Sequence, residues 1–257
     1  MASAALPPKR PDLTGPFDII GDVHGCLDEL RALLALLGYQ AGEVVTPPPG
    51  RTAVFLGDLV DRGPNIAGVL ALVLGMAAAG TALCVAGNHD AKLVRQLKGN
   101  NVRLTNGLAE SVGQLARETP EFRQRVLDFL ERRPSHYELD GGRLVVAHGG
   151  LPEAMHGHDD GAARAFALFG AATGKLDAEG LPVRLNWAAD YRGAARVVYG
   201  HTPVARPEWV NGTINIDTGC VFGGRLTALR YPELELVSVP AARAYAETRR
   251  TFLTPPA

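Results

Sequence analysis

The sequence predicts an α/β fold organised around a mostly parallel β-sheet. Residues 17–21, 51–56 and 82–86 are short apolar runs that are typical of buried strands. Segments with helical character separate them, and this alternation indicates βαβ units with parallel strands. Each run leads through a glycine into polar residues. Because parallel strands end on one edge of their sheet, we expect these polar loops to converge there.

Composition limits the class of protein. With 257 residues, of which 46% are hydrophobic and 21% charged, the chain is typical of a globular protein with a full core. Its formal net charge of −1 provides no broad basic surface for long nucleic acid, although recognition of a single phosphorylated end would not need one. The cysteines Cys26, Cys84 and Cys220 contain no Cys-x-x-Cys pair, which argues against a disulfide framework or a structural zinc site. We therefore expect a reducing, cytoplasmic location.

We expect one domain at residues 17–247, between a flexible leader at 1–16 and a tail at 248–257. The leader is rich in alanine and proline and lacks the apolar core of a signal peptide. Residues 66–87 carry no charge and are long enough to cross a bilayer. Gly75, Gly80 and Thr81 divide that stretch into a helix, a turn and a strand, so no membrane association is expected.

The first strand, at residues 17–21, leads into Asp22 and His24, which lie two residues apart and can point to the same side. A helix at 26–37 follows, with an apolar face formed by leucines at helical spacing. The second strand, at 51–56, leads into residues 57–63, with the sequence Gly-Asp-Leu-Val-Asp-Arg-Gly. The third, at 82–86, leads into residues 87–90, with the sequence Gly-Asn-His-Asp.

Residues 91–133 are predicted to be a helical insertion, with Thr119 capping a helix that begins at Pro120. A hairpin follows, with strands at 135–140 and 143–147, and leads into His148. Residues 151–194 are less regular, and we expect residues 156–160 to form a solvated loop rather than a further metal site. A strand at 195–199 leads into His201. The remaining chain is rich in strands at 209–217, 225–231 and 234–239.

Five polar loops therefore follow apolar strands, and they carry three histidines, two aspartates and an asparagine that can bind metal ions: Asp22, His24, Asp58, Asn88, His148 and His201. A single histidine after a strand usually has a structural role, but the coincidence of five such loops favours a metal-binding site. Nitrogen and oxygen ligands suit Mn²⁺, Fe, Ni²⁺ or Zn²⁺. Asp58, central in the order, can bridge two ions, which would clamp a phosphoryl group and activate water.

Three further side chains have roles in this interpretation. Arg62 would bind the phosphate through two parallel hydrogen bonds. His89 would transfer a proton to the leaving oxygen, and Asp61 would orient it. Taken alone, residues 57–63 are also consistent with a surface turn held by ion pairs.

The motifs Gly-Asp-Val-His-Gly, Gly-Asp-Leu-Val-Asp-Arg-Gly, Gly-Asn-His-Asp, His-Gly-Gly and Gly-His-Thr, in this order, resemble those of the binuclear metallophosphoesterases. The Val-Asp-Arg-Gly form resembles the phosphoprotein-phosphatase, calcineurin-like branch. Longer stretches, including 17–39, 180–193 and 198–232, are most similar to the phosphatase domain of bacterial polynucleotide kinase-phosphatase, an RNA-repair enzyme. A related dinucleoside-tetraphosphate hydrolase family shares many of them.

The resemblance implies a four-layer fold, with two packed mixed β-sheets flanked by helices. It also implies two divalent ions, with Mn²⁺ preferred over Ni²⁺, Fe or Zn²⁺. The implied ligands are Asp22, His24 and Asp58 for one ion, and Asp58, Asn88, His148 and His201 for the other. Arg62 would bind the phosphate, and His89 with Asp61 would form the acid dyad. Asp217 is a further implied active-site residue, with a structural role in its Asp-Thr-Gly turn as the alternative.

The resemblance also implies the activity that we expect, which is hydrolysis of phosphomonoesters and cyclic phosphodiesters at RNA 3′ ends. No Gly-x-x-x-x-Gly-Lys-[Ser/Thr] motif is present, so the chain contains no kinase P-loop. It is either a free-standing domain or one excised from a multidomain protein, and separate kinase or ligase repair proteins are candidate partners. The alternatives are a dinucleoside-tetraphosphate hydrolase and a protein Ser/Thr phosphatase. A non-enzymatic module that recognises phosphorylated partners is disfavoured because no ligand position is missing.

Overall fold

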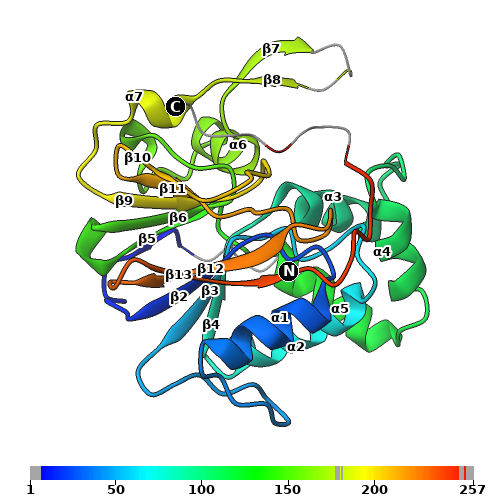
Figure 1. The fold of residues 1–257 in the computed structure, drawn as a ribbon. Coiled ribbons are helices and arrows are strands. Elements are labelled where there is room, and N and C mark those ends of the chain that lie inside the picture. The colour runs from blue at the N-terminus through cyan, green and yellow to red at the C-terminus, as the bar shows by residue number, and fades with distance from the viewer. Residues whose placement is uncertain (1–6, 177–179, 181, 249–251, 253–257) are drawn as a thin grey trace.

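A computed structural model describes residues 7–176, 180, 182–248 and 252. Two mixed β-sheets pack face to face, and helices cover the outer face of each (Figure 1). The predicted four-layer α/β architecture is confirmed. The expectation of one mostly parallel sheet is wrong in detail, because there are two sheets and each combines parallel with antiparallel strand pairs.

The five-stranded sheet has the order β13-β12-β2-β3-β4. Its strands are β2 (Phe17–Ile20), β3 (Thr52–Phe55), β4 (Ala82–Cys84), β12 (Arg225–Tyr231) and β13 (Glu235–Pro240). β2, β3 and β4 are parallel because helices α1 (Leu27–Leu36) and α2 (Ile66–Ala78) return the chain to the same end of the sheet. Their carboxyl ends therefore share one edge.

The six-stranded sheet has the order β1-β5-β6-β9-β11-β10. Its strands are β1 (Lys9–Arg10), β5 (His136–Leu139), β6 (Leu144–Ala147), β9 (Arg196–Tyr199), β10 (Trp209–Val210) and β11 (Thr213–Asn215). β6, β9 and β11 run parallel, and β5 joins β6 as the predicted hairpin, through the short helix η1 (Asp140–Gly142). A separate hairpin, β7 (Ala172–Leu176) and β8 (Pro182–Arg184), projects beyond this sheet (Figure 1).

The alternation of side chains along each strand divides the core. Ile19 and Val54 lie in the apolar cluster between the two sheets, whereas Ile20 and Phe55 face the helices. The helical insertion on that side contains α3 (Asn88–Leu97), α4 (Leu108–Leu115) and α5 (Pro120–Glu131). The predicted cap is present, since Thr119 accepts a hydrogen bond from the Phe122 amide at 3.2 Å.

The outer face of the six-stranded sheet is covered by shorter elements. These are η2 (Glu153–Met155), α6 (Gly161–Phe169) and α7 (Trp187–Asp190). Asp160 caps α6 by accepting hydrogen bonds from the Ala162 and Ala163 amides, both at 2.9 Å. His158 and Asp160 have side chains that are 60% and 61% exposed, as expected of a solvated segment.

The N-terminal segment departs from the predicted flexible leader. Residues 1–6 lie outside the described part, but β1 pairs with β5, and the Asp140 amide donates to Leu13 O at 2.8 Å. The edge of the six-stranded sheet offers free backbone groups, and this segment satisfies them. Most of the predicted tail lies outside the described residues.

The three cysteines are free and buried. No helix among the described residues has the length and apolar character required to cross a membrane.

Candidate active site

The predicted site residues converge between the carboxyl-terminal edges of the two sheets. The loops after β2 and β3 contribute Asp22 and His24, then the 57–63 segment, and the first turn of α3, after β4, contributes Asn88 and His89. From the other sheet, the loops after β6, β9 and β11 contribute His148, His201 and Asp217. The site therefore depends on both sheets.

The backbone of these loops is strained. Nine non-glycine residues in the described chain have a positive φ, and five of them are site residues: His24 (43°), Asp58 (46°), Asp61 (73°), Arg62 (70°) and His201 (75°). This left-handed conformation is costly for residues with a Cβ and is concentrated at functional sites. Here it turns each side chain from the end of a strand into the space between the sheets.

One group of side chains brings acceptor atoms together. Asn88 Oδ1 lies 2.9 Å from His148 Nε2 and 2.8 Å from His201 Nδ1, and the two ring nitrogens are 3.0 Å apart. His148 Nδ1 lies 3.0 Å from Leu56 O, to which it can donate. In its neutral form the Nε2 lone pair then faces the Asn88 oxygen, an arrangement that a cation stabilises.

Asp58 lies between this group and His24. Its Oδ2 is 3.3 Å from His148 Nε2 and 3.6 Å from His24 Nε2. Two sets of potential metal ligands therefore share Asp58: one with His24 and His89, the other with His148 and His201. This central position is the geometry required of a bridging carboxylate.

Asp22 lies on the His148 side of the site rather than against His24. Its Oδ2 accepts a hydrogen bond from the His201 amide at 3.1 Å and is 3.8 Å from His148 Nδ1. Its Oδ1 is buried and has no hydrogen-bond partner among the residues that the structure describes. A buried carboxylate oxygen without a partner is costly, so the residues present fit a bound cation.

The protonation equilibria are also consistent with metal ligands. Burial, followed by Arg62, holds the pKa of His24 well below its usual value, and burial with His148 does the same for His201. Both rings are thus neutral, the form that binds metals. Burial raises the pKa of Asp58, but His148, His89 and His24 outweigh it and hold that pKa well below the usual value.

The remaining groups show how much negative charge is buried. Burial and Asp217 raise the pKa of Asp22 well above its usual value. Burial opposes protonation of His148, yet Asp58 and Asp22 raise its pKa to about 10. The carboxylates thus retain a proton on His148, and a divalent ion would compete with that proton.

A second cluster joins His89, Asp61 and Arg62. His89 Nδ1 lies 2.5 Å from Asp61 Oδ2, and Ser111 on α4 donates to Asp61 Oδ1 at 2.5 Å. Arg62 directs one terminal nitrogen at His24 Nε2 (2.7 Å) and the other at His89 Nε2 (2.8 Å). Its two N–H groups form the fork that can bind two phosphate oxygens.

Asp217 has the structural role that the sequence left open. Its Oδ1 accepts a hydrogen bond from the Gly219 amide at 3.0 Å, which closes the Asp-Thr-Gly turn. Burial raises its pKa to about 6, and its negative charge adds to that around Asp22. A catalytic role for Asp217 stays a prediction.

Three residues of the site were missed by sequence reasoning. Ser111 holds Asp61, and Asp90 accepts hydrogen bonds from the Leu59 and Gly87 amides at 3.0 and 3.2 Å. Arg184, on β8, places Nη2 2.6 Å from His201 Nε2. Asp90 is part of a recognised motif and follows the pattern of a helix-capping residue. Ser111 and Arg184 have no local signal, because their contacts depend on how distant elements pack.

Comparison with known proteins gives a consistent family. A sequence profile of calcineurin-like phosphoesterases matches residues 15–237. The chain is 45% identical over 242 residues to an asymmetrical bis(5′-nucleosyl)-tetraphosphatase PrpE from Anoxybacillus flavithermus, covering 92% of this chain and 99% of that protein. The PrpE tetraphosphatase of Bacillus subtilis is 44% identical over 238 residues, covering 91% and 98%.

Solved structures show the same fold. A crystal structure described as a candidate diadenosine tetraphosphatase has a TM-score of 0.65 and 28% identity, covering 94% of this chain and 99% of that one. A protein serine/threonine phosphatase from Saccharomyces cerevisiae has a TM-score of 0.59 at 16% identity, covering 94% and 82%. The latter likeness concerns the fold alone.

Removal of the shared carboxylate should abolish metal binding. We expect Asp58→Ala to lose most bound divalent metal and more than about 100-fold of phosphoesterase activity, because both ligand sets depend on it. Metal per chain, measured by mass spectrometry after dialysis, and turnover of p-nitrophenyl phosphate provide the test. Asp28→Ala, an exposed carboxylate on α1, is the matched control. Full metal content in Asp58→Ala would contradict the bridging assignment.

Loss of the Ser111 hydroxyl should weaken the dyad without changing the metal content. Ser111→Ala leaves Asp61 Oδ1 buried without its donor, which we expect to cost about 1–3 kcal/mol of unfolding free energy. Urea unfolding measures that loss. We also expect kcat to fall more than KM changes, because the substrate contacts remain. Unchanged kcat in a normally folded variant would show that Ser111 does not position Asp61 for catalysis.

Proposed function

The chain belongs to the calcineurin-like phosphoesterase family, and from this premise we propose that it hydrolyses dinucleoside tetraphosphates asymmetrically, to a nucleoside triphosphate and a nucleoside monophosphate. The observation that carries the proposal is its 44–45% identity to asymmetrical tetraphosphatases across almost their full length. Dinucleoside tetraphosphates, which were the alternative substrate in the sequence analysis, therefore become the leading one. Hydrolysis of RNA 3′ ends, which the sequence resemblance ranked first, and separate repair partners receive no support from these relatives.

The ligand sets around Asp58 would hold two divalent ions. When bound, such ions neutralise phosphate charge and lower the pKa of water, so that hydroxide is available as the nucleophile. The ligands on one side would be His24 with Asp58, and on the other Asp58, Asn88, His148 and His201, with Asp22 alongside. Mn²⁺ is our preferred metal on the ground of the family resemblance, and the nitrogen and oxygen donors also suit Fe, Ni²⁺ or Zn²⁺.

Arg62 would bind the phosphoryl group under attack. In the structure its guanidinium contacts ring nitrogens of His24 and His89, which are weaker partners than phosphate oxygens. A phosphate that accepts both N–H groups would release Nε2 of His89. His89 can then carry a proton on Nε2, directed at the leaving oxygen, while Asp61 holds Nδ1.

The leaving group decides how much this proton matters. In a dinucleoside tetraphosphate the departing nucleoside polyphosphate is a stabilised anion, so its release needs little help from an acid. An alkyl phosphate releases an alkoxide, which does need protonation. The presence of the dyad therefore favours a second activity, on alkyl phosphomonoesters.

A substrate panel tests the proposal. With Mn²⁺, we expect diadenosine tetraphosphate to be hydrolysed with the highest kcat/KM, compared with 3′-phosphorylated RNA, 2′,3′-cyclic-phosphate RNA and a phosphopeptide. Chromatography should show equal amounts of ATP and AMP. Two molecules of ADP would refute asymmetrical cleavage. A higher kcat/KM on either RNA substrate would instead support hydrolysis of RNA 3′ ends.

His89→Ala should separate substrates by leaving group. We expect a loss of about 100-fold or more on β-glycerophosphate, because the alkoxide would leave unprotonated. The loss on p-nitrophenyl phosphate and on diadenosine tetraphosphate should be much smaller. Steady-state kcat values with saturating Mn²⁺ provide the comparison. Equal losses on all three substrates would remove the general-acid role.

A further inference from the structure

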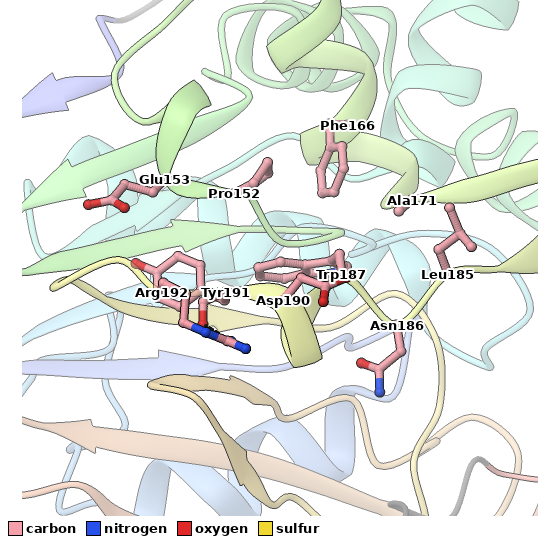
Figure 2. A pocket seen from close by; sticks show the side chains of 10 residues that line it. All are labelled: Pro152, Glu153, Phe166, Ala171, Leu185, Asn186, Trp187, Asp190, Tyr191 and Arg192. Atoms are coloured by element: carbon pink, nitrogen blue, oxygen red, sulfur yellow. Dashed lines mark hydrogen bonds between the residues drawn. The ribbon is translucent and has the colours of Figure 1, made fainter.

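A cavity of about 420 Å³ lies on the outer side of the six-stranded sheet, lined by residues of η2, α6 and α7 and of the segments next to them. Figure 2 shows Trp187 at its centre, with Phe166 across from it and Tyr191 nearby. Leu185, Asn186 and Asp190 complete the side nearest α7. The combination of aromatic rings with a few polar groups is typical of a small-molecule site.

The cavity shares its supporting loops with the proposed metal site. Trp187 packs over Gly150, two residues after His148, and a Cβ at Gly150 would overlap the indole ring. The Trp187 and Tyr199 rings are 5.1 Å apart, and Tyr199 lies two residues before His201. Leu185 directly follows Arg184, whose Nη2 contacts His201. The cavity therefore adjoins the loops that carry His148 and His201.

Trp187 is held as a rigid platform. Phe166 and Tyr191 meet it edge to face, with ring centroids 5.9 and 6.1 Å away. Despite these contacts the side chain is only half-buried and lines the cavity. A fixed aromatic face beside a phosphate site is the arrangement on which a nucleobase stacks, a contact worth about 1–3 kcal/mol. The amide of Asn186 and the carboxylate of Asp190 can bind the edge of a base.

We propose that this cavity binds the nucleobase of the nucleotide whose phosphate occupies the neighbouring site, with Trp187 as the stacking surface. The inference rests on the proposed function for its substrate class. It assigns substrate selection to α7 and its flanking residues, whereas Asp58 and Arg62 act on any phosphoryl group.

Fluorescence tests the cavity without relying on turnover. The chain has two tryptophans, Trp187 and Trp209, so Trp209→Phe leaves Trp187 as the sole tryptophan. We expect AMP to quench its emission saturably, because the base stacks on the indole. Ribose 5-phosphate, which has the phosphate but no base, should not. Equal responses to the two ligands would overturn the proposal.

Kinetics tests the same residue in catalysis. For Trp187→Ala, we expect the ratio of kcat/KM on diadenosine tetraphosphate to that on p-nitrophenyl phosphate to fall about 10-fold or more, mostly through KM. Trp187→Phe should recover most of this ratio, since phenylalanine also stacks. Equal losses on both substrates would assign Trp187 a purely structural role.

The two experiments separate this inference from the proposed function. If the wild-type protein cleaves p-nitrophenyl phosphate but no dinucleotide, while AMP still quenches Trp187, the tetraphosphatase function fails and the cavity assignment stands. If diadenosine tetraphosphate is cleaved, but AMP leaves the emission unchanged and Trp187→Ala retains the wild-type ratio, the function stands and the cavity assignment fails.

Discussion

The site depends on direct backbone contact between the loops that follow β2, β3 and β4. A Cβ at Gly63 would overlap the carbonyl oxygen of His24, and one at Gly57 would overlap the backbone at Gly87. Glycine lets the loops approach so closely that Asp58, His24 and His89 reach one space. Asp90 then fixes the contact by accepting hydrogen bonds from the Leu59 and Gly87 amides. Close approach of the backbones explains why the positive φ values in the loops after β2 and β3 can be held in place.

The sequence predicts the loops well because a physical rule connects them. Parallel strands end on one edge, so polar residues after β2, β3 and β4 must meet, whatever the side-chain details. The second set, around His148 and His201, comes from the other sheet, and only the family resemblance predicted that the sheets pack together. Ser111 and the ordered residues before Phe17 escaped prediction, because their contacts are made across the fold and leave no pattern in the local sequence.

The buried negative charge indicates that the place where these loops meet is a cation-binding site rather than a purely structural contact. Asp22, Asp58, Asp90 and Asp217 are all at most 5% exposed, and they face few permanent cations. An apolar core would not retain such carboxylates without partners. Their effect is visible in the pKa of His148, which rises to about 10 despite burial. The site thus favours positive charge, and two divalent ions would add to the charge that Arg62 and Arg184 supply.

The two proposed roles, metal binding by His148 and base stacking by Trp187, both depend on one short loop, the segment that follows β6. His148 faces Asp58, and two residues later Gly150, at φ 85°, leaves room for Trp187. Between them, Gly149 donates to Ala167 O on α6 at 2.5 Å. Because this backbone is tied on both sides, a displacement of Trp187 would be transmitted to His148 more directly than to Arg62. In the proposed site, α7 and the ligand set around His148 therefore share one structural support.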